Sequence, residues 1–263
     1  MRIAGSTVLL TGATGGVGHA LARELKEKGA KLVLTGRRAD ALEPLAAEFD
    51  ARTVTADLSD LDHVTRLAEE CADTDILIAN AGLPNSGDLL DYTPEQLDRA
   101  LTVNLHAPVL LARLLAPRMV EAGRGHIAFV GSISGKATTR SASLYNATKF
   151  GLRGFALGFR QDLHGTGVGV SVVQPGFIRD AGMFAATGVT LPGGMRTVSP
   201  GQVASGVTRA VERDAAEINV APVELRMLSA IAGQFPGFAE KVTRRTSADR
   251  TIGQIVKAQR EKR

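Results

Sequence analysis

The chain contains little cysteine, no tryptophan and no long uninterrupted apolar run. Its 263 residues include a single cysteine, Cys71, in a segment of helical spacing. One cysteine forms no internal disulfide, so we expect a small buried residue in a reducing compartment. No run approaches the about 18 to 20 apolar residues that span a bilayer, and the first strand pattern follows no apolar signal segment. We therefore expect a soluble, cytoplasmic protein.

Patterns typical of metal sites and of nucleic-acid binding are also missing. The five histidines show no metal-ligand spacing, so no metal is expected. The net charge is +4, and residues 240–263 alone carry eight Lys or Arg against three acidic residues. No aromatic residue lies among these charges for base stacking, so we expect no nucleic-acid partner. We expect this basic tail to be solvated; contact with a membrane surface is the alternative, which we do not expect.

Strand patterns and helix patterns alternate along the chain. Strand patterns cover residues 7–10, 31–35, 52–55, 76–78, 125–130, 168–173 and 217–220, and helix patterns cover 21–27, 39–49, 60–71, 93–121, 143–163 and 200–212. This alternation predicts an α/β fold, a three-layer doubly wound parallel sheet of the Rossmann type, as a single domain over residues 1–220. We expect residues 221–263 to form a short helical C-terminal extension with the basic tail, packed on the substrate pocket or on a partner subunit.

A glycine-rich turn connects the first strand pattern to the first helix pattern. It reads Thr11-Gly12-Ala13-Thr14-Gly15-Gly16-Val17-Gly18. Glycines at such a turn let the backbone approach a pyrophosphate, and the helix N-terminus supplies N–H groups and a favourable dipole. A purely structural tight turn uses the same residues, but the order strand, turn, helix favours a dinucleotide site.

Two arginines follow the second strand pattern. In dinucleotide-binding folds an acidic residue at this point holds the ribose hydroxyls of NAD, whereas an arginine accommodates the 2′-phosphate of NADP. Here Gly36 occupies the acidic position, and Arg37 and Arg38 follow it. The sequence therefore favours NADP(H) over NAD(H), with solvated loop charges as the alternative.

Polar side chains follow three further strand patterns. Asp57, Asn80 and Ser132 lie near the ends of the third, fourth and fifth patterns. Because the carboxyl ends of parallel strands form the ligand crevice, we expect these residues to share one site. Ser132 either holds a substrate oxygen or caps a turn. Asn104, in the apolar part of the long helix pattern, is either functional or a buried amide bonded to the backbone.

Tyr145 and Lys149 form a candidate proton-transfer pair. They stand four residues apart in a helix pattern, so they lie on one face about one turn apart. A free tyrosine has a pKa near ~10, and a neighbouring cation stabilises its phenolate and moves the pKa toward neutrality. The alternative is an ordinary core tyrosine next to a solvated lysine.

Together these residues resemble the short-chain dehydrogenase/reductase family, in its shorter single-domain branch, over residues 6–220. The matching motifs, in the order of the family, are Thr11-Gly12-x3-Gly16-x-Gly18, Asp57, Asn80-Ala81-Gly82, Asn104, Ser132, Tyr145-x3-Lys149 and Pro175-Gly176. The resemblance implies an oxidoreductase that interconverts a ketone and a secondary alcohol with a nicotinamide cofactor. It also implies a homodimer or homotetramer formed through the two long helices.

The resemblance further implies roles for individual residues. Tyr145 is the general acid in ketone reduction and the base in alcohol oxidation, and Lys149 lowers its pKa and binds the nicotinamide ribose. Ser132 orients the substrate carbonyl, and Asn104 holds a water in the proton relay. The other expected cofactor-binding residues are Gly12, Thr14, Gly16, Val17, Gly18, Arg37, Arg38, Asp57, Leu58, Asn80, Ala81, Gly82, Pro175, Gly176 and Ile178.

Three features differ from the family pattern. Gly12, Gly15 and Gly18 also fit the spacing of the longer, epimerase-like branch, but the chain is too short for the larger substrate domain of that branch. Gly15 replaces the basic residue that NADP-using members often carry in the turn, so NADP(H) rests on the two arginines alone. Asp180 follows the Pro-Gly turn where a threonine is usual, and its carboxylate either accepts the nicotinamide amide or makes no contact.

The segment 180–199 has the length and composition of an active-site lid. Its larger apolar residues are Met183, Phe184, Val189, Leu191 and Met195. They favour a largely apolar substrate, lipid-, steroid- or acyl-like, although core packing explains some of them equally well. Arg179 and Arg196 are available to a carboxylate. A redox sensor without turnover, and a lyase or epimerase on the same fold, are the alternative functions.

Overall fold

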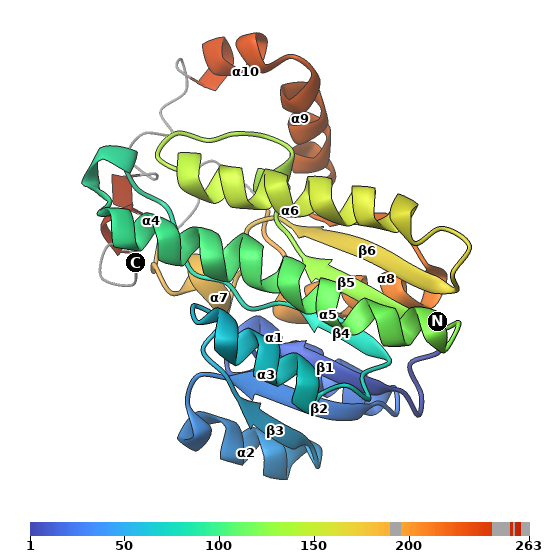
Figure 1. The fold of residues 1–263 in the computed structure, drawn as a ribbon. Coiled ribbons are helices and arrows are strands. Elements are labelled where there is room, and N and C mark those ends of the chain that lie inside the picture. Colours follow the sequence, from blue (N-terminus) through green and yellow to red (C-terminus); the bar gives the residue numbers. More distant parts are fainter. Residues whose placement is uncertain (190–195, 244–252, 255, 259–263) are drawn as a thin grey trace.

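The computed structural model describes residues 1–189, 196–243, 253–254 and 256–258 (Figure 1). Within these residues seven strands form one parallel sheet in the order β3-β2-β1-β4-β5-β6-β7. The strands are β1 (Thr7–Thr11), β2 (Lys31–Gly36), β3 (Arg52–Thr55), β4 (Ile76–Ala79), β5 (Gly125–Val130), β6 (Val168–Pro175) and β7 (Glu217–Val220). The predicted doubly wound sheet is confirmed.

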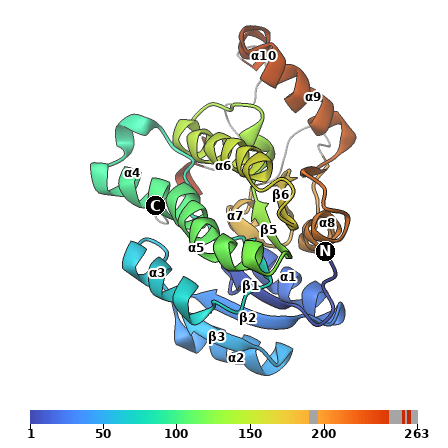
Figure 2. The ribbon, with the colours of Figure 1, turned by 45° about the vertical axis from the view of Figure 1, so that its right-hand side comes forward.

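Helices cover both faces of the sheet (Figures 1 and 2). One face carries α1 (Gly16–Glu27), α2 (Ala39–Phe49) and α8 (Pro200–Arg213), and the other carries α3 (Leu61–Glu70), α5 (Ala107–Glu121) and α6 (Ser143–Asp162). The remaining helical segments are η1 (Leu89–Asp91), α4 (Pro94–Leu101), η2 (Thr102–His106), η3 (Ile133–Gly135), α7 (Gly182–Ala185), α9 (Val223–Gln234) and α10 (Pro236–Thr243).

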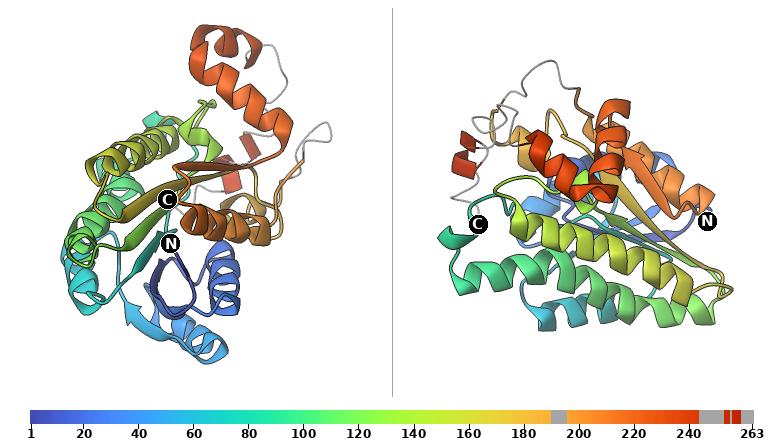
Figure 3. Two further views of the ribbon diagram at one scale, coloured as in Figure 1. Left: turned by 90° about the vertical axis from the view of Figure 1, so that its right-hand side faces the viewer. Right: turned by 90° about the horizontal axis from the view of Figure 1, so that it is seen from above.

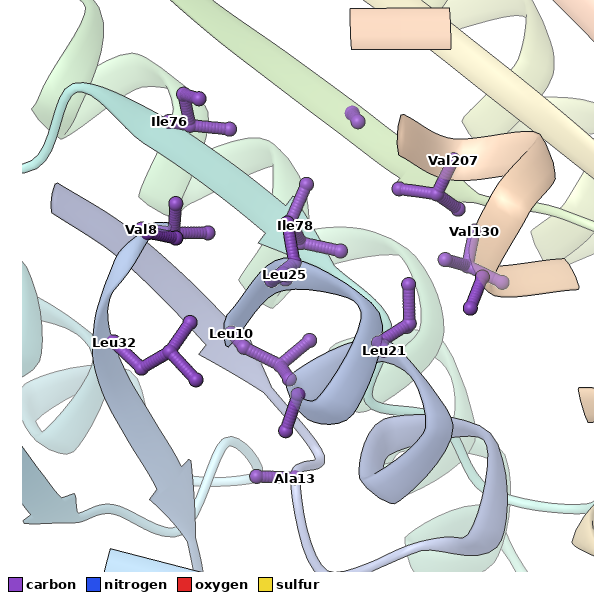
Figure 4. Close-up of a cluster of buried hydrophobic side chains, with 14 of the residues drawn as sticks. Val8, Leu10, Ala13, Leu21, Leu25, Leu32, Ile76, Ile78, Val130 and Val207 are labelled. Atoms are coloured by element: carbon purple, nitrogen blue, oxygen red, sulfur yellow. The ribbon is translucent and has the colours of Figure 1, made fainter. Parts of the chain in front are cut away.

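Strand β1 lies inside the sheet and is buried on both sides. Val8 and Leu10 belong to the core beneath α1 and α8, and Leu9 belongs to the opposite core. Figure 4 shows the first of these cores, where Leu21 and Leu25 of α1 lie beside the strand residues. Burial of each such side chain stabilises the fold by roughly 1.5–3 kcal/mol. Because β1 is covered on both faces, the middle of its sequence is a continuous apolar run.

The order of the strands reverses between β1 and β4, which lie side by side in the sheet. Chain order runs from β1 to β3 in one direction and from β4 to β7 in the other. At such a switch point the connections leave to opposite faces and open a crevice at the carboxyl ends of the strands. The turns that follow β1, β4, β5 and β6 all meet at this edge.

Residues 94–121 form one continuous helical segment. It begins with a capping box, in which Thr93 and Gln96 exchange hydrogen bonds between side chain and backbone, with Pro94 in the first turn. By length and composition alone, Pro94–Glu121 is apolar enough to cross a membrane. Every 18-residue window of this segment includes Asn104 and His106, so the segment meets that test without being an uninterrupted apolar run. Half of the apolar window is buried, because α5 packs on the sheet.

Two helices after β7 extend away from the sheet layers, as Figure 3 shows for α9 and α10. The expected helical extension is confirmed, and Pro236 begins its second helix. The exposed apolar side chains of α9 and its end are Val223, Met227, Leu228, Ile231 and Phe235. Most of the basic tail, at residues 244–252, 255 and 259–263, lies outside the described residues.

Candidate active site

A cavity of about 780 Å³ opens at the carboxyl edge of the sheet, along the switch point. It is lined by the turns after β1, β2, β3, β4, β5 and β6, together with residues of α6, α7 and α9. Every predicted catalytic and cofactor-binding residue lines it except Asn104 and Arg38. The roles of the lining residues stay predictions, and the two residues outside the lining need a separate account.

The glycine-rich turn forms a cradle in which Gly12 and Gly18 leave no room for a Cβ. Gly12 has a φ of 68°, and a Cβ on Gly18 would collide with the carbonyl oxygen of Gly12. No side chain caps the N-terminus of α1, where Gly15 is the cap residue, and the first turn holds no acidic residue. Backbone N–H groups and the positive end of the helix dipole thus face the cavity, an arrangement that fits the pyrophosphate of a dinucleotide.

Asn80 fixes the cradle to the neighbouring strand. Its Nδ2 donates to the carbonyl oxygens of Thr11, at 3.0 Å, and Gly12, at 3.2 Å. In return, the Thr11 hydroxyl accepts the backbone N–H groups of Asn80 and Ala81, each at 3.0 Å. Asn80 therefore acts first as a tie between β4 and the turn, and Thr11 is the partner on which that tie depends.

Asp57 and Arg37 mark the end of the cavity beyond β2 and β3. Burial raises the pKa of Asp57, but hydrogen bonds from Ser59 and the nearby guanidinium groups of Arg37 and Arg99 outweigh it and hold the pKa below its usual range. Arg99, on α4, also lines the cavity. The sequence had not pointed to it, since nothing in a helix 42 residues after Asp57 indicates that the two meet.

Arg38 takes a different direction from Arg37. It precedes α2, and its Nη1 lies 4.0 Å from the Asp40 carboxylate, with both side chains exposed. It does not line the cavity. The prediction that the two arginines act together is thus corrected: consecutive residues at a strand end point to opposite sides, and only Arg37 faces the site.

Tyr145 and Ser132 meet in the cavity. Burial raises the pKa of Tyr145, and a hydrogen bond with Ser132 opposes this rise. Ser132 follows β5 and its hydroxyl also accepts the N–H of Ser134, at 3.1 Å. The expectation that the pKa of Tyr145 lies closer to neutrality is therefore corrected: in this pocket desolvation of the phenolate outweighs the stabilising contacts.

Lys149 lies one turn further along α6 and is almost fully buried. Its Nζ lies 5.8 Å from the centre of the Tyr145 ring and donates to the carbonyl oxygen of Val130, at 3.2 Å. Burial lowers the pKa of Lys149 to about 8. The ammonium of Lys149 therefore lies beside the phenol of Tyr145, and burial makes this ammonium more acidic than a solvated lysine.

Asn104 does not line the cavity. It lies in the π-helical turn η2, and its side chain forms two hydrogen bonds with the backbone of Leu83, 2.7 Å from the Leu83 nitrogen and 2.9 Å from the oxygen. The side chain is therefore occupied in holding the loop after β4. The predicted water contact stays a prediction, which no observation tests.

The outer part of the cavity is apolar. Phe177 and Phe184 pack with ring centres 5.0 Å apart, and Met183 lies over the loop after β4. Leu225, Leu228, Ile231 and Ala232 of α9 add a wall from the C-terminal extension, as does Val256. Packing on the substrate pocket was one of the two arrangements expected for this extension, and α9 lines the cavity.

The predicted lid is only partly described. Met183 and Phe184 line the cavity, Val189 does not, and Leu191 and Met195 lie outside the described residues. The base of the segment is closed by a bridge between Ile178 and Val198.

Three charged residues of this segment lie away from the cavity lining. Asp180 pairs with Arg179 at 3.3 Å, and Arg196 makes a bidentate pair with Glu224, at 3.0 and 2.7 Å. Asp180 therefore shows no contact of the kind considered for the nicotinamide amide. The two arginines already hold carboxylates of the protein.

Comparisons with known proteins agree with this geometry. The family model described as short chain dehydrogenase matches residues 6–190. The chain is 34% identical over 227 residues to the ketoacyl reductase HetN of Nostoc sp., covering 83% of this chain and 79% of that protein. It is 32% identical to an uncharacterized oxidoreductase of Staphylococcus aureus, over 82% and 96% of the two chains.

A solved structure provides a further comparison. A short-chain dehydrogenase from Sphingobium yanoikuyae, in complex with NADPH, superposes with a TM-score of 0.78 at 28% identity, covering 93% of this chain and 99% of that one. The family match spans most of the chain and includes the glycine cradle, Ser132, Tyr145 and Lys149. The chain therefore belongs to the short-chain dehydrogenases.

Proposed function

We propose that this oxidoreductase reduces a ketone to a secondary alcohol with NADPH, on a largely apolar substrate. The observation that carries the proposal is the hydrogen bond between Ser132 and Tyr145, with the Lys149 ammonium beside it, in a cavity that continues into the glycine cradle. A binding module or redox sensor has no use for a buried proton donor. Retention of all three groups therefore favours catalysis.

In the proposed reaction the chain orients the carbonyl and delivers the proton. The hydroxyl groups of Ser132 and Tyr145 donate hydrogen bonds to the carbonyl oxygen, and Tyr145 transfers its proton to that oxygen. The Lys149 ammonium stabilises the phenolate that remains. NADPH, held by the glycine cradle, supplies the hydride to the carbonyl carbon. The raised pKa of Tyr145 keeps the phenol protonated at neutral pH, which is the form that donates a proton in reduction.

The substrate proposal rests on the outer cavity. Aromatic, aliphatic and methionine side chains from the lid and from α9 line it, and such a wall favours an acyl chain or another extended apolar group. A ketoacyl reductase among the relatives points the same way. A β-ketoacyl thioester and a bulky ketone are the two substrate classes to compare.

The test of catalysis uses the two tyrosines of the chain. Removing the Tyr145 hydroxyl (Y145F) should leave NADPH binding intact and lower turnover by ~10²-fold or more, because the proton donor is lost. Tyr92, buried away from the cavity, provides the control: Y92F should keep turnover. NADPH oxidation is followed with a panel of ketones and ketoacyl thioesters. Equal turnover in Y145F and the unmodified protein would refute the assigned role, and NADPH binding with no turnover on any substrate would favour a sensor.

The cofactor preference is tested on the two arginines. We expect NADPH to bind at least about tenfold more tightly than NADH, ~1.4 kcal/mol, and R37A to remove most of that difference. R38A is the matched control, because Arg37 lines the cavity whereas Arg38 lies beside Asp40. Fluorescence titration with both cofactors measures the four affinities. A larger loss of preference in R38A than in R37A would contradict the assignment.

A further inference from the structure

Ser132 is held from behind by a buried glutamine. The N–H of Ser132 donates to the Oε1 atom of Gln174, on β6, at 2.7 Å, and the Gln174 side chain has no solvent exposure. The residue before Ser132 must be small, because a Cβ on Gly131 would collide with this same Oε1 atom. The position of the catalytic serine therefore depends on which way the amide of Gln174 is turned.

A glutamate on the next strand sets that orientation. The Nε2 atom of Gln174 donates to Oε1 of Glu217, on β7, at 3.4 Å. A carboxylate only accepts hydrogen bonds, so Glu217 requires the NH₂ group of the amide to face it. The carbonyl oxygen of the amide is then directed to the N–H of Ser132.

The same carboxylate binds two cations from the elements that carry the catalytic residues. Lys136, at the end of the turn η3 that Ser132 begins, lies 2.9 Å from Oε1 of Glu217. Arg153 donates to both oxygens, each at 3.1 Å. Arg153 lies on α6, two turns after Tyr145 and on its face of the helix. Lys136 and Glu217 are each only 18% exposed, so solvent screens this pair weakly.

Glu217 thus connects the two segments whose relative position decides whether Ser132 and Tyr145 meet. It reaches the serine turn through Gln174 and Lys136, and the tyrosine helix through Arg153. Burial raises the pKa of Glu217, but the hydrogen bonds from Arg153 and Lys136 outweigh it and keep the group ionised at neutral pH. Glu217 does not line the cavity, unlike the residues proposed to touch substrate or cofactor.

We propose that Glu217 is a positioning residue for the reduction: it orients Gln174 and Lys136 against the Ser132 turn and holds that turn in register with the helix of Tyr145 and Lys149. The inference rests on the proposed function for its kinetic consequence. A shift of the serine hydroxyl by a fraction of an ångström weakens its hydrogen bond to the carbonyl oxygen in the transition state.

The experiment changes charge with little change in shape. In E217Q the new amide can offer its own NH₂ group to Gln174, so the Gln174 amide loses its fixed orientation. We expect kcat to fall by about ten- to hundredfold, with the Kd for NADPH within about twofold. In a background of S132A, measured by single-turnover kinetics at high protein concentration, E217Q should cost less than about twofold, because the group through which it acts is gone.

A matched control lies on the same helix. Arg160 of α6 makes an equivalent bidentate pair with Asp214, at 2.7 and 2.8 Å, just before β7 and away from the serine turn. D214N removes that carboxylate at a residue with a φ of 48°, a conformation that asparagine tolerates. We expect D214N to lower the melting temperature. Any effect of D214N on kcat should be the same in the unmodified protein and in the S132A background.

Two outcomes would overturn the proposal. One is that E217Q lowers kcat by the same factor in the unmodified protein and in the S132A background. The other is that E217Q does not lower kcat. If E217Q does not fold, Q174L carries the same double-mutant test, because it leaves the N–H of Ser132 without its acceptor.

Amide hydrogen exchange at Ser132 gives a readout that needs no turnover. Faster exchange in E217Q than in D214N supports the network, and unchanged exchange refutes it. Failure to find any reduced ketone would instead count against the proposed function, and the exchange result would still decide the role of Glu217.

Discussion

Burial moves the pKa values of Tyr145 and Lys149 in opposite directions. Desolvation penalises the charged form of each group, so the phenol holds its proton more firmly and the ammonium holds its proton less firmly. The pair is therefore in the acid form needed for reduction over a limited pH range. The upper limit of that range is set by the lysine.

This limit gives a prediction about pH. The pKa of Lys149 is lowered to about 8, so the ammonium is present below that pH and lost above it. We expect kcat/KM for ketone reduction to be level near neutrality and to fall as pH rises past about 8. Stopped-flow or steady-state kinetics over a range of pH measure this fall in kcat/KM. In Y145F the affinity for NADPH should weaken over the same range; affinity independent of pH would show that another group sets the limit.

Residue types and spacing predicted which side chains lie together in the cavity where the geometry is local. Tyr145 and Lys149 share a helix face, and Ser132 directly follows a strand, so neighbours in sequence fix their direction. Arg38 was expected at the site, but its partner Asp40, in the first turn of the next helix, is set by the fold. Asn104 shows the backbone-bonded arrangement that the sequence left open, and its partner Leu83 lies in a loop 21 residues earlier.

At the level of elements, α9 contributes to the cavity from beyond the part of the chain that the family model matches. The family match ends at residue 190, yet five residues of α9 line the cavity. The helix is seated closely, since Leu225 would lie 3.0 Å from a Cβ on Gly176, the glycine that follows β6. We infer that α9 takes part in substrate choice.

Shortening one side chain of α9 tests this inference. L225A should raise KM for bulky apolar ketones by about tenfold, ~1.4 kcal/mol, because the removed methyl groups contact the substrate, and it should leave NADPH binding unchanged. M227A is the control, since Met227 is 61% exposed and does not line the cavity. Equal effects of the two substitutions on KM would place the substrate elsewhere.

Element boundaries were predictable where composition changes sharply. The predicted ranges 39–49, 52–55, 125–130 and 217–220 match α2, β3, β5 and β7. The π-helical turn η2 was not predicted. It contains Asn104, whose side chain bonds to the backbone of Leu83 in another loop, and local helix propensity does not indicate such a contact. The short helix α7 was missed because four residues show no period.

At the scale of the whole molecule, the edge of the sheet opposite the site contains a buried histidine. His126 is 1% exposed, its Nε2 lies 2.8 Å from the Ser171 hydroxyl, and Ser171 donates to the carbonyl oxygen of Ala215. Burial lowers the pKa of His126 to about 4; nearby Asp214 opposes this, while Arg160 and the N-terminal ammonium add to it. The folded protein therefore holds this imidazole neutral.

Stability should depend on pH through this group. The unfolded chain binds a proton at His126 below pH ~6.5 and the folded chain only below about 4, so stability falls as pH drops between these values. We expect a loss of about 2 kcal/mol between pH 6.5 and 5. Denaturant unfolding of the unmodified protein and H126Q measures it: the variant should lose less over this interval. Parallel curves would assign acid sensitivity to the carboxylates alone.

Pairing of subunits through α5 and α6 stays a prediction.

The two halves of the site come from opposite sides of the switch point. The groups that hold the carbonyl oxygen come from β5 and α6, whereas the cradle comes from β1 and α1. In the proposed reaction a prochiral ketone is thus fixed by its oxygen on one side and approached by hydride from the other. With the apolar wall of α9 admitting the larger substituent in one orientation only, the alcohol should form as a single enantiomer.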